Sequence, residues 1–249
     1  MKGFTPLRPD PRAPLVRANP VVKLIAAAVL MTVLFVASGP ITPALVLAGI
    51  LASLPLAGLG VRTLLGRTWP LLVAALMVGL LNVLLAPASS DGPDFVTGLA
   101  LGLRLLGIAL SGVIALATTD PTDLADSLQQ QARLSPRLAV GALAAVRMLP
   151  ILAVEWQLLG MARRARGVSA GWSPFATARL AFGKLLALLV GAVRRATRLA
   201  LAMEARGFGA APCRTIARPQ RVRAADWVLL VAAVALGAAG LGIGSALPV

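Results

Sequence analysis

Histidine is absent from this chain of 249 residues, and cysteine occurs only once, as Cys213. Without histidine the sequence lacks the usual metal ligand and the usual proton shuttle, so metal catalysis and histidine-based nucleophilic catalysis are not expected. A single cysteine allows no disulfide within the chain. Cys213 is interpreted as a small side chain in a loop and not as a reactive thiol.

Acidic residues are also scarce, with 9 Asp and Glu against 24 Lys and Arg, which gives a formal net charge of +15. Aromatic residues make up only 4% of the chain, and the basic residues flank apolar stretches. The positive charge is therefore attributed to the positive-inside bias of membrane proteins, and to attraction to anionic lipid or an acidic partner. Nucleic acid is not an expected partner.

Hydrophobic residues dominate the composition. They account for 58% of the chain, charged residues for 13%, and the mean hydropathy is +0.87. Ordinary soluble domains carry about a quarter charged residues. An apolar excess of this size has to be solvated by lipid, so the sequence predicts a multi-pass membrane protein.

Five stretches are apolar for about the 20 residues that a helix needs to cross the hydrocarbon core. Lys and Arg in the connections predict their direction. The basic N-terminal arm and the Arg62–Arg67 turn are placed in the cytoplasm, and the arm is interpreted as a retained segment rather than a cleaved signal. The connections Gly39–Pro43 and Ala86–Thr97 lack Lys and Arg, so they and the C-terminus are placed outside. The predicted spans are approximately Val21–Ser38, Pro43–Val61, Trp69–Leu85, Gly98–Ala117 and Trp227–Ile243.

Polar and small residues occur inside two of these spans. Asn82 and Arg104 are interpreted as anchors between helices or at the interface, and contact with another membrane subunit is the functional alternative. Arg104 can reach outward to the interface, which lowers the cost of roughly 2.5–3.5 kcal/mol for a charge at the bilayer centre. Gly98 and Gly102 predict a close approach to another helix.

Residues 119–226 are predicted to hold three cytoplasmic helices, each of which begins at a capping side chain followed by proline. Pro150 is expected to interrupt and kink the second helix. The third has an apolar core, Leu185–Val193, that is too short to cross a bilayer. Its basic residues fall within an arc of roughly 120°, so this helix is expected to lie along the membrane interface. The helices run from Thr119-Asp120-Pro121 to about Gln131, from Ser135 to Gly167 and from Ser173 to Gly207, and the basic residues of the arc are Lys184, Arg194, Arg195, Arg198 and Arg206.

The second and third of these helices end in the same triplet, Ala165-Arg166-Gly167 and Ala205-Arg206-Gly207. One copy would be an ordinary helix end, because Gly supplies a left-handed cap and Arg suits the negative end of the dipole. Two copies on the cytoplasmic side of one membrane protein favour a second interpretation. Arg offers carboxylates a rigid, permanently charged fork and is a frequent interface hot spot. Both arginines are predicted to enter acidic pockets on a soluble, two-lobed partner.

Several motifs follow one another along nearly the whole chain. Together they resemble the transmembrane T component of energy-coupling factor (ECF) transporters, a family that includes the cobalt, biotin and shared-module T proteins. The Pro-rich N-terminal arm departs from the family pattern. The matching segments are Asn19–Leu24 with its Pro-x-x-Lys-Leu, Arg104 with Thr118-Thr119, Asp123–Leu128, Arg147–Pro150 with Glu155, Arg163–Gly167, and Glu204–Gly207.

The resemblance implies a scaffold and coupling subunit of an ATP-driven importer for a vitamin or a transition-metal ion, in a bacterial-type inner or cell membrane. Its partners would be two cytoplasmic ATP-binding-cassette ATPases, membrane lipid, and a membrane S component that captures the cargo. No catalytic residue, cofactor or resident metal is implied, in agreement with the absence of a Gly-rich phosphate loop of the Lys-Ser/Thr type. The ATPase-docking residues would be Ala165, Arg166 and Gly167 on one coupling helix, and Ala205, Arg206 and Gly207 on the other.

The predicted fold class is therefore an all-α membrane protein with about five transmembrane helices plus cytoplasmic coupling helices. The predicted divisions are a cytoplasmic N-terminal arm (1–20), transmembrane helices 1–4 (21–118), a cytoplasmic coupling-helix region (119–226), and transmembrane helix 5 with the C-terminal tail (227–249).

Two other functions are weighed against this one. A membrane enzyme acting on lipid or isoprenoid substrates would hold a metal at an acid-rich motif. The acid cluster formed by Asp120, Asp123 and Asp126 fits helix capping better. A stand-alone secondary transporter would need inverted repeats and ionisable groups at mid-membrane, and the sequence shows neither.

Overall fold

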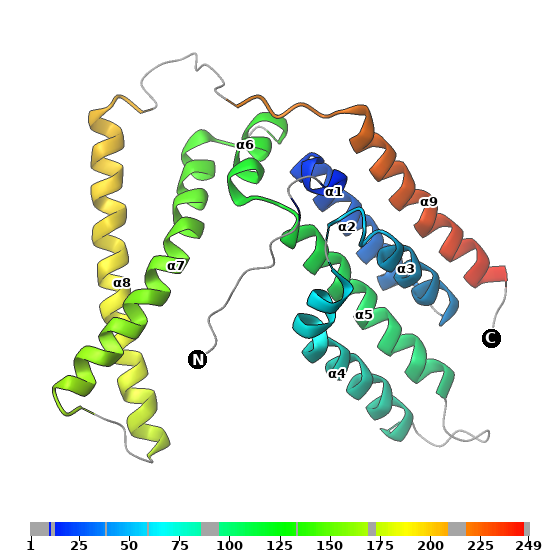
Figure 1. Ribbon diagram of the computed structural model, residues 1–249, viewed down its shortest axis with the longest axis horizontal. Coiled ribbons are helices and arrows are strands. Elements are labelled where there is room, and N and C mark those ends of the chain that lie inside the picture. The colour runs from blue at the N-terminus through cyan, green and yellow to red at the C-terminus, as the bar shows by residue number, and fades with distance from the viewer. Residues whose placement is uncertain are drawn as a thin grey trace. The chain divides into compact units, whose positions relative to one another are not determined.

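The computed structural model describes most of the chain, and every regular element in the described residues is an α-helix (Figure 1). The predicted all-α class is thus confirmed. Cys213, the arm residues Lys2, Arg8 and Arg12, and most of the predicted outer loop Ala86–Thr97 lie outside the described residues. The described residues are 10, 13–37, 39–58, 60–85, 95–132, 134–168, 173–208 and 218–246, with the backbone alone at 61–63, 65 and 67. The helices are α1 (Pro14–Arg17), α2 (Pro20–Val36), α3 (Ile41–Ala52), α4 (Val61–Leu85), α5 (Phe95–Ala117), α6 (Pro121–Gln131), α7 (Pro136–Ala165), α8 (Pro174–Ala205) and α9 (Ala224–Ala246).

Two compact units make up the chain, and each is described by itself. The core unit consists of residues 1–132 and 220–249 and contains α1 to α6 and α9. The paired-helix unit consists of residues 133–219 and contains α7 and α8. Both triplets therefore belong to the paired-helix unit, and the Pro-x-x-Lys-Leu motif belongs to the core unit.

The core unit is built around α2 and α5. Helix α2 packs against α9, α5, α3 and α6, and α5 packs against α4 and α3 as well. Figure 1 shows α9, the last helix of the chain, beside α2 and α3. These helices are apolar on most of their circumference, so each can bury one face against a neighbour and leave another face for lipid. The buried cluster where they meet includes Leu34, Val46, Ile50, Leu54, Leu110 and Ile114.

The second predicted span, Pro43–Val61, is wrong in its C-terminal part. Helix α3 ends at Ala52, and a turn occupies the residues up to Gly58, whose φ is +63°. The segment is apolar, so hydropathy alone continues the span, but Pro55 has no N–H to donate and Gly58 takes the left-handed conformation. The next helix begins at Val61, so Arg62–Arg67 lies in α4 and not in a turn.

Five helices of the described residues are long and apolar enough to cross a membrane, and this number agrees with the prediction. The set differs, because α2 and α3 have only 17 and 12 residues while α7 and α8 qualify. Helix α8 is one unbroken helix of 32 residues in which Ala-rich turns extend the short apolar core Leu185–Val193. Helix α7 runs through Pro150 without interruption, contrary to the prediction, and a bend there stays a prediction. The qualifying helices are α4 in its part Thr68–Leu85, α5, α7, α8 and α9.

Arg104 joins α5 to the end of α2. Its Nη1 donates to the carbonyl oxygen of Ala37 at 3.5 Å, and its guanidinium lies over the Phe35 ring, 5.1 Å from the centroid. Of the two anchoring roles that the sequence left open for Arg104, this contact is the interhelical one, and contact with another membrane subunit stays a prediction. Asn82 is exposed on α4, and its role stays a prediction.

Glycines bring α4 and α5 close together, as the sequence predicted for Gly98 and Gly102. A Cβ on Gly98 would lie 2.7 Å from the carbonyl oxygen of Gly79, and one on Gly102 would lie 3.1 Å from that of Ala75. We expect Gly98→Val to push the helices apart and to lower the free energy of unfolding by about 1–3 kcal/mol. The measurement is thermal unfolding of the purified chain in detergent.

Gly66, also on α4, is the matched control, because nothing lies within 4 Å of a Cβ added there. Gly66→Val should unfold at the same temperature as the parent. An equal loss in the Gly66 and Gly98 variants would contradict the close-approach argument.

Candidate docking site

The first triplet ends α7 in a glycine-capped turn. Gly167 has φ +75°, and its N–H donates to the carbonyl oxygen of Arg164 at 2.9 Å. The N–H of Val168 donates to the carbonyl oxygen of Arg163 at 3.0 Å. These two bonds form a Schellman motif, which satisfies the last carbonyls of a helix and needs a left-handed residue after the cap. Arg166 is the cap residue, so its backbone is fixed on both sides.

The second triplet ends α8 in the same way. Gly207 has φ +72°, and its N–H donates to the carbonyl oxygen of Glu204 at 2.9 Å. The N–H of Phe208 donates to the carbonyl oxygen of Met203 at 2.9 Å. The sequence prediction that both Ala-Arg-Gly triplets end helices in a left-handed glycine is confirmed.

Both triplet arginines are exposed. Within the described residues, no hydrogen bond or ion pair involves the guanidinium of Arg166 or of Arg206. A guanidinium on a fixed backbone and without a partner of its own is available to an external carboxylate. Ala165 and Ala205, which precede them, are small and exposed as well, so neither helix end carries a bulky side chain beside its arginine.

The two helix ends lie at opposite ends of the paired-helix unit. Late residues of α7 meet early residues of α8, as Arg163 does with Leu180, while Glu155 forms an ion pair with Arg195 further along α8. The helices are therefore antiparallel, and Figure 1 shows them crossing. Helix α7 has 30 residues, and at 1.5 Å per residue the two ends are about 45 Å apart. The arrangement presents two separate cationic points rather than one patch.

An apolar groove lies between α7 and α8, on the side toward the end of α8. Its volume is about 670 Å³. Arg137 and Glu204 are the charged residues that line it, and alanines of both helices line it as well. Large apolar side chains that line it include Met148, Leu149, Leu152, Leu199, Met203 and Phe208.

A buried carboxylate joins two helix starts in the core unit. Asp226 is only 1% exposed; its Oδ2 accepts from the N–H of Arg223 at 2.7 Å and its Oδ1 from the N–H of Asn19 at 2.9 Å. Arg223 directly precedes α9 and Asn19 directly precedes α2. One carboxylate thus satisfies an N-terminal N–H at each helix and lies at the positive end of both dipoles.

Asp226 was missed by the sequence analysis. The available signal was an acid in the first turn of a helix that follows a basic, non-helical segment.

Lys23 lies in the first turn of α2, close to the junction that Asp226 forms, and bonds to two other segments of the core unit. It is 5% exposed, and its Nζ donates to the carbonyl oxygens of Thr118 at 2.7 Å and Val16 at 3.4 Å. Thr118 directly follows α5, whose last carbonyls carry partial negative charge, so the ammonium stabilises that helix end. The lysine of the Pro-x-x-Lys-Leu motif therefore ties α1, α2 and α5 together.

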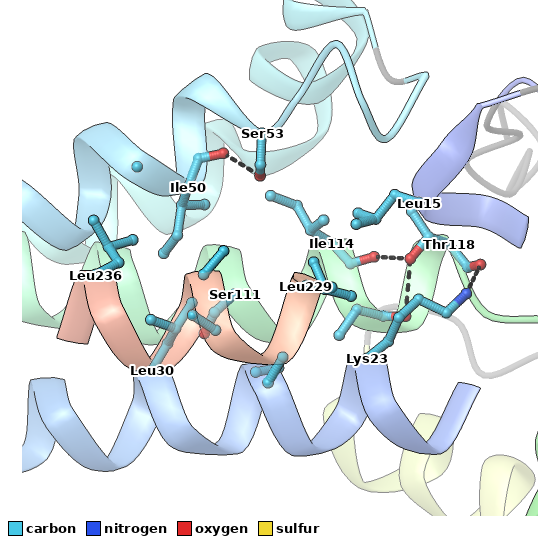
Figure 2. Close-up of a pocket in the computed structure, with 16 residues that line it drawn as sticks. Leu15, Lys23, Leu30, Ile50, Ser53, Ser111, Ile114, Thr118, Leu229 and Leu236 are labelled. Atoms are coloured by element: carbon cyan, nitrogen blue, oxygen red, sulfur yellow. Dashed lines mark hydrogen bonds between the residues drawn. The ribbon is translucent and has the colours of Figure 1, made fainter. Parts of the chain in front are cut away.

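Lys23 also borders a cavity between helices of the core unit (Figure 2). The cavity is lined mostly by apolar side chains from α2, α3, α5 and α9. Its volume of about 160 Å³ falls below the roughly 300–1,000 Å³ of usual ligand pockets. Its hydroxyls are engaged by backbone carbonyl oxygens close in sequence, since Ser53 Oγ donates to that of Ile50, Ser111 Oγ to that of Ile108 and Thr118 Oγ1 to that of Ile114. The cavity therefore does not have the features of a substrate site.

Two members of the acid cluster at the start of α6 make contacts within the chain. Asp120 Oδ1 accepts from the N–H of Thr122 at 2.7 Å, which confirms the predicted cap, and Asp123 Oδ1 accepts from Nε2 of Gln220 at 3.3 Å. In the part of the chain that the structure describes, no three His, Cys, Asp or Glu side chains are grouped as a metal site would require.

Comparison with known proteins gives the same family as the motifs. The CbiQ family, described as cobalt transport protein, matches residues 11–215. A curated protein of Leuconostoc gelidum subsp. gasicomitatum named energy-coupling factor transporter transmembrane protein EcfT is 34% identical over 49% of this chain, and the match spans about half (49%) of that relative's length. A protein of the same name from Limosilactobacillus fermentum is 28% identical over 88% of both chains.

A further relative is much longer than this chain. It is a Bifidobacterium longum protein whose provisional name is ABC transporter ATP-binding protein, and it is 26% identical over 88% of this chain but over only 30% of its own length.

The family match takes in α1 to α8 and both helix ends with their exposed arginines. It confirms the resemblance to T components that the order of motifs indicated. With its apolar helices, the chain is a multi-pass membrane protein and belongs to the CbiQ cobalt transport protein family.

Proposed function

We propose that this chain is the transmembrane coupling subunit of an ECF-type importer for a vitamin or a transition-metal ion. It docks two cytoplasmic ATP-binding-cassette ATPases, one at Ala165-Arg166-Gly167 and one at Ala205-Arg206-Gly207. Movements of the ATPases pass through α7 and α8 to a membrane S component that holds the cargo. The chain itself catalyses no reaction.

One observation carries this proposal: two helices end in the same glycine-capped geometry, and each end presents an exposed arginine without a recorded partner among the described residues. A single helix end of this kind needs no partner to explain it. Two of them, about 45 Å apart by the helix rise, fit two separate acidic grooves.

The names of the relatives support the same partners. Two matching relatives are named as transmembrane proteins of energy-coupling factor transporters. The Bifidobacterium longum relative is named for ATP binding, and the part that resembles this chain is under a third of it. A segment similar to this chain thus occurs within a protein named for ATP binding, which supports an ATPase as the physical neighbour of this subunit.

The proposal places α7 and α8 on the cytoplasmic face of the membrane, although both are long and apolar enough to span it. As a transmembrane hairpin, this antiparallel pair would put Arg166 and Arg206 on opposite sides of the bilayer. It would also carry Arg147 and Lys184 into the hydrocarbon, at roughly 2.5–3.5 kcal/mol for each charge near the centre. Lying flat, the pair keeps both ends in reach of cytoplasmic ATPases.

The apolar faces of the pair need a cover in this arrangement. Exposed large side chains on α8 include Phe182, Leu185, Leu189 and Val193, and the groove between the helices is apolar as well. Contiguous exposed apolar surface of this kind marks contact with membrane or protein. We assign this surface to membrane lipid and the S component.

Cysteine labelling in whole cells tests the placement. In a Cys213→Ser background, single cysteines at Ala162 and Ala202, both exposed near the helix ends, should react with a membrane-permeant maleimide and resist an impermeant one. Gly39→Cys is the matched control, because an added Cβ meets nothing within 4 Å and the position is placed outside. It should react with the impermeant reagent. Labelling of either helix end from outside would rule out the proposed docking.

A further inference from the structure

Arg163 connects the end of α7 to α8. Its Nη1 donates to the carbonyl oxygen of Leu180 at 2.8 Å. The guanidinium lies against Gly183, where an added Cβ would be 3.0 Å from Nη2 and 3.1 Å from Nη1. The missing side chain of Gly183 is therefore what lets this arginine reach the backbone of the neighbouring helix.

The backbone of the same residue takes part in the glycine-capped end. The carbonyl oxygen of Arg163 accepts from the N–H of Val168 at 3.0 Å and from the N–H of Arg166 at 3.1 Å. Arg163 is thus bonded to α8 through its side chain and to the triplet through its main chain. A displacement of the Arg163 guanidinium would therefore shift the helix end on which Arg166 lies.

Two further contacts cross between the helices. Lys184 Nζ lies 5.2 Å from the centroid of the Trp156 ring, and a Cβ on Gly160 would be 3.1 Å from the same nitrogen. Further along, Arg195 pairs with Glu155. These contacts hold the middle of the pair, whereas the Arg163 contact is the one nearest the triplet of α7.

The next residue supplies a contrast. Arg164 has the same charge as Arg163 and lies in the same helical turn. It is exposed, however, and its guanidinium has no hydrogen-bond or ion-pair partner within the described residues. Charge alone therefore does not distinguish the two neighbouring arginines; contact with α8 does.

We propose that Arg163 is a positioning residue, which locks the docking end of α7 onto α8 so that Arg166 is presented in one direction. The geometric part of this proposal, that Arg163 holds the end of α7 against α8, concerns this chain alone. Its consequence for ATPase docking rests on the proposed function.

Spin-label distance measurements on the purified, detergent-solubilised chain test the geometric part. With Cys213 replaced by Ser, one label pair at Met161 and Phe182 reports on the locked end, and a second pair at Val146 and Leu201 reports on the opposite half; all four are exposed. Arg163→Met should broaden the distance distribution of the first pair and leave that of the second unchanged, which also shows that the chain is folded.

Three further variants complete the test. Gly183→Val should broaden the first distribution as Arg163→Met does, because it displaces the guanidinium without removing it. Arg163→Lys, which keeps one donor, should restore most of the parent distribution. Arg164→Met is the matched control and should behave as the parent. The proposal is overturned if Arg163→Met leaves the first distribution unchanged, or if Arg164→Met broadens it equally.

Copurification with the ATPases tests the consequence. Arg163→Met should retain Arg166 yet bind the ATPases about tenfold more weakly, the effect of losing one hydrogen bond from a charged donor. A broadened distribution with unchanged binding would overturn the consequence and keep the geometric lock. Unchanged binding in Arg166→Ala, by contrast, would count against the proposed function itself.

Discussion

Replacing Arg166 and Arg206 together with alanine is expected to remove detectable copurification of the ATPases, and uptake of the cargo with it. Each guanidinium is exposed at a glycine-capped helix end. A desolvated interface arginine contributes about 2 kcal/mol or more, so each single replacement should weaken binding about 30-fold. Because the two ends lie about 45 Å apart along the helix pair, the losses should add to about 1,000-fold.

Arg194→Ala is the matched control for this experiment. Arg194 is an exposed arginine of α8 whose guanidinium has no recorded partner within the described residues, and it lies away from the triplet. It should copurify as the parent does, with equal yield in the membrane. A double variant that keeps its ATPases, or an Arg194 variant that loses them to the same degree, would refute specific docking at the helix ends.

Asp226→Ala is expected to lower the free energy of unfolding of the core unit by about 3–5 kcal/mol. The carboxylate is 1% exposed and accepts one N–H at the start of α2 and one at the start of α9. Hydrogen bonds to a charged group contribute about 1.5–3 kcal/mol each, and the two N–H groups would be left buried without partners. The measurement is the midpoint of thermal unfolding of the purified chain in detergent. Where unfolding is reversible, a denaturant titration gives the free energy of unfolding itself.

A second capping aspartate provides the comparison. Asp120 accepts one N–H at the exposed start of α6, so Asp120→Ala should cost only about 1 kcal/mol. Asp226→Asn should fall between the two, because one acceptor oxygen remains. Equal midpoints for Asp226→Ala and Asp120→Ala would show that the buried junction does not hold the helix starts together.

Much of the local structure could be predicted because its causes lie within one helical turn. The starts of α6, α7 and α8 follow from Asp120, Ser135 and Ser173, each of which caps its helix and precedes proline. The ends of α7 and α8 follow from Gly167 and Gly207 in the left-handed conformation. These interactions depend on neighbours three or four residues away, which the sequence displays directly.

The membrane spans could be predicted only in part, because hydropathy counts apolar residues and ignores backbone conformation. The stretch that includes Pro55 and Gly58 is apolar, yet it folds as a turn and shortens α3. The stretch around Leu185–Val193 has basic residues on both sides, yet it lies within a helix long enough to qualify as a span. Hydropathy predicted three of the five qualifying helices, α4, α5 and α9, and missed α7 and α8.

The helical class, the apolar character of the chain and the capped helix ends with their two arginines follow from the order of the amino acids. The packing of the helices is what brings Asp226 to Asn19, Lys23 to Thr118, and Arg163 to Leu180 across Gly183. The physical reason is that a helix apolar on most of its circumference has no periodic pattern to select the face that packs. The partners of its few polar residues are therefore set by which helices come together, and these lie far apart along the chain.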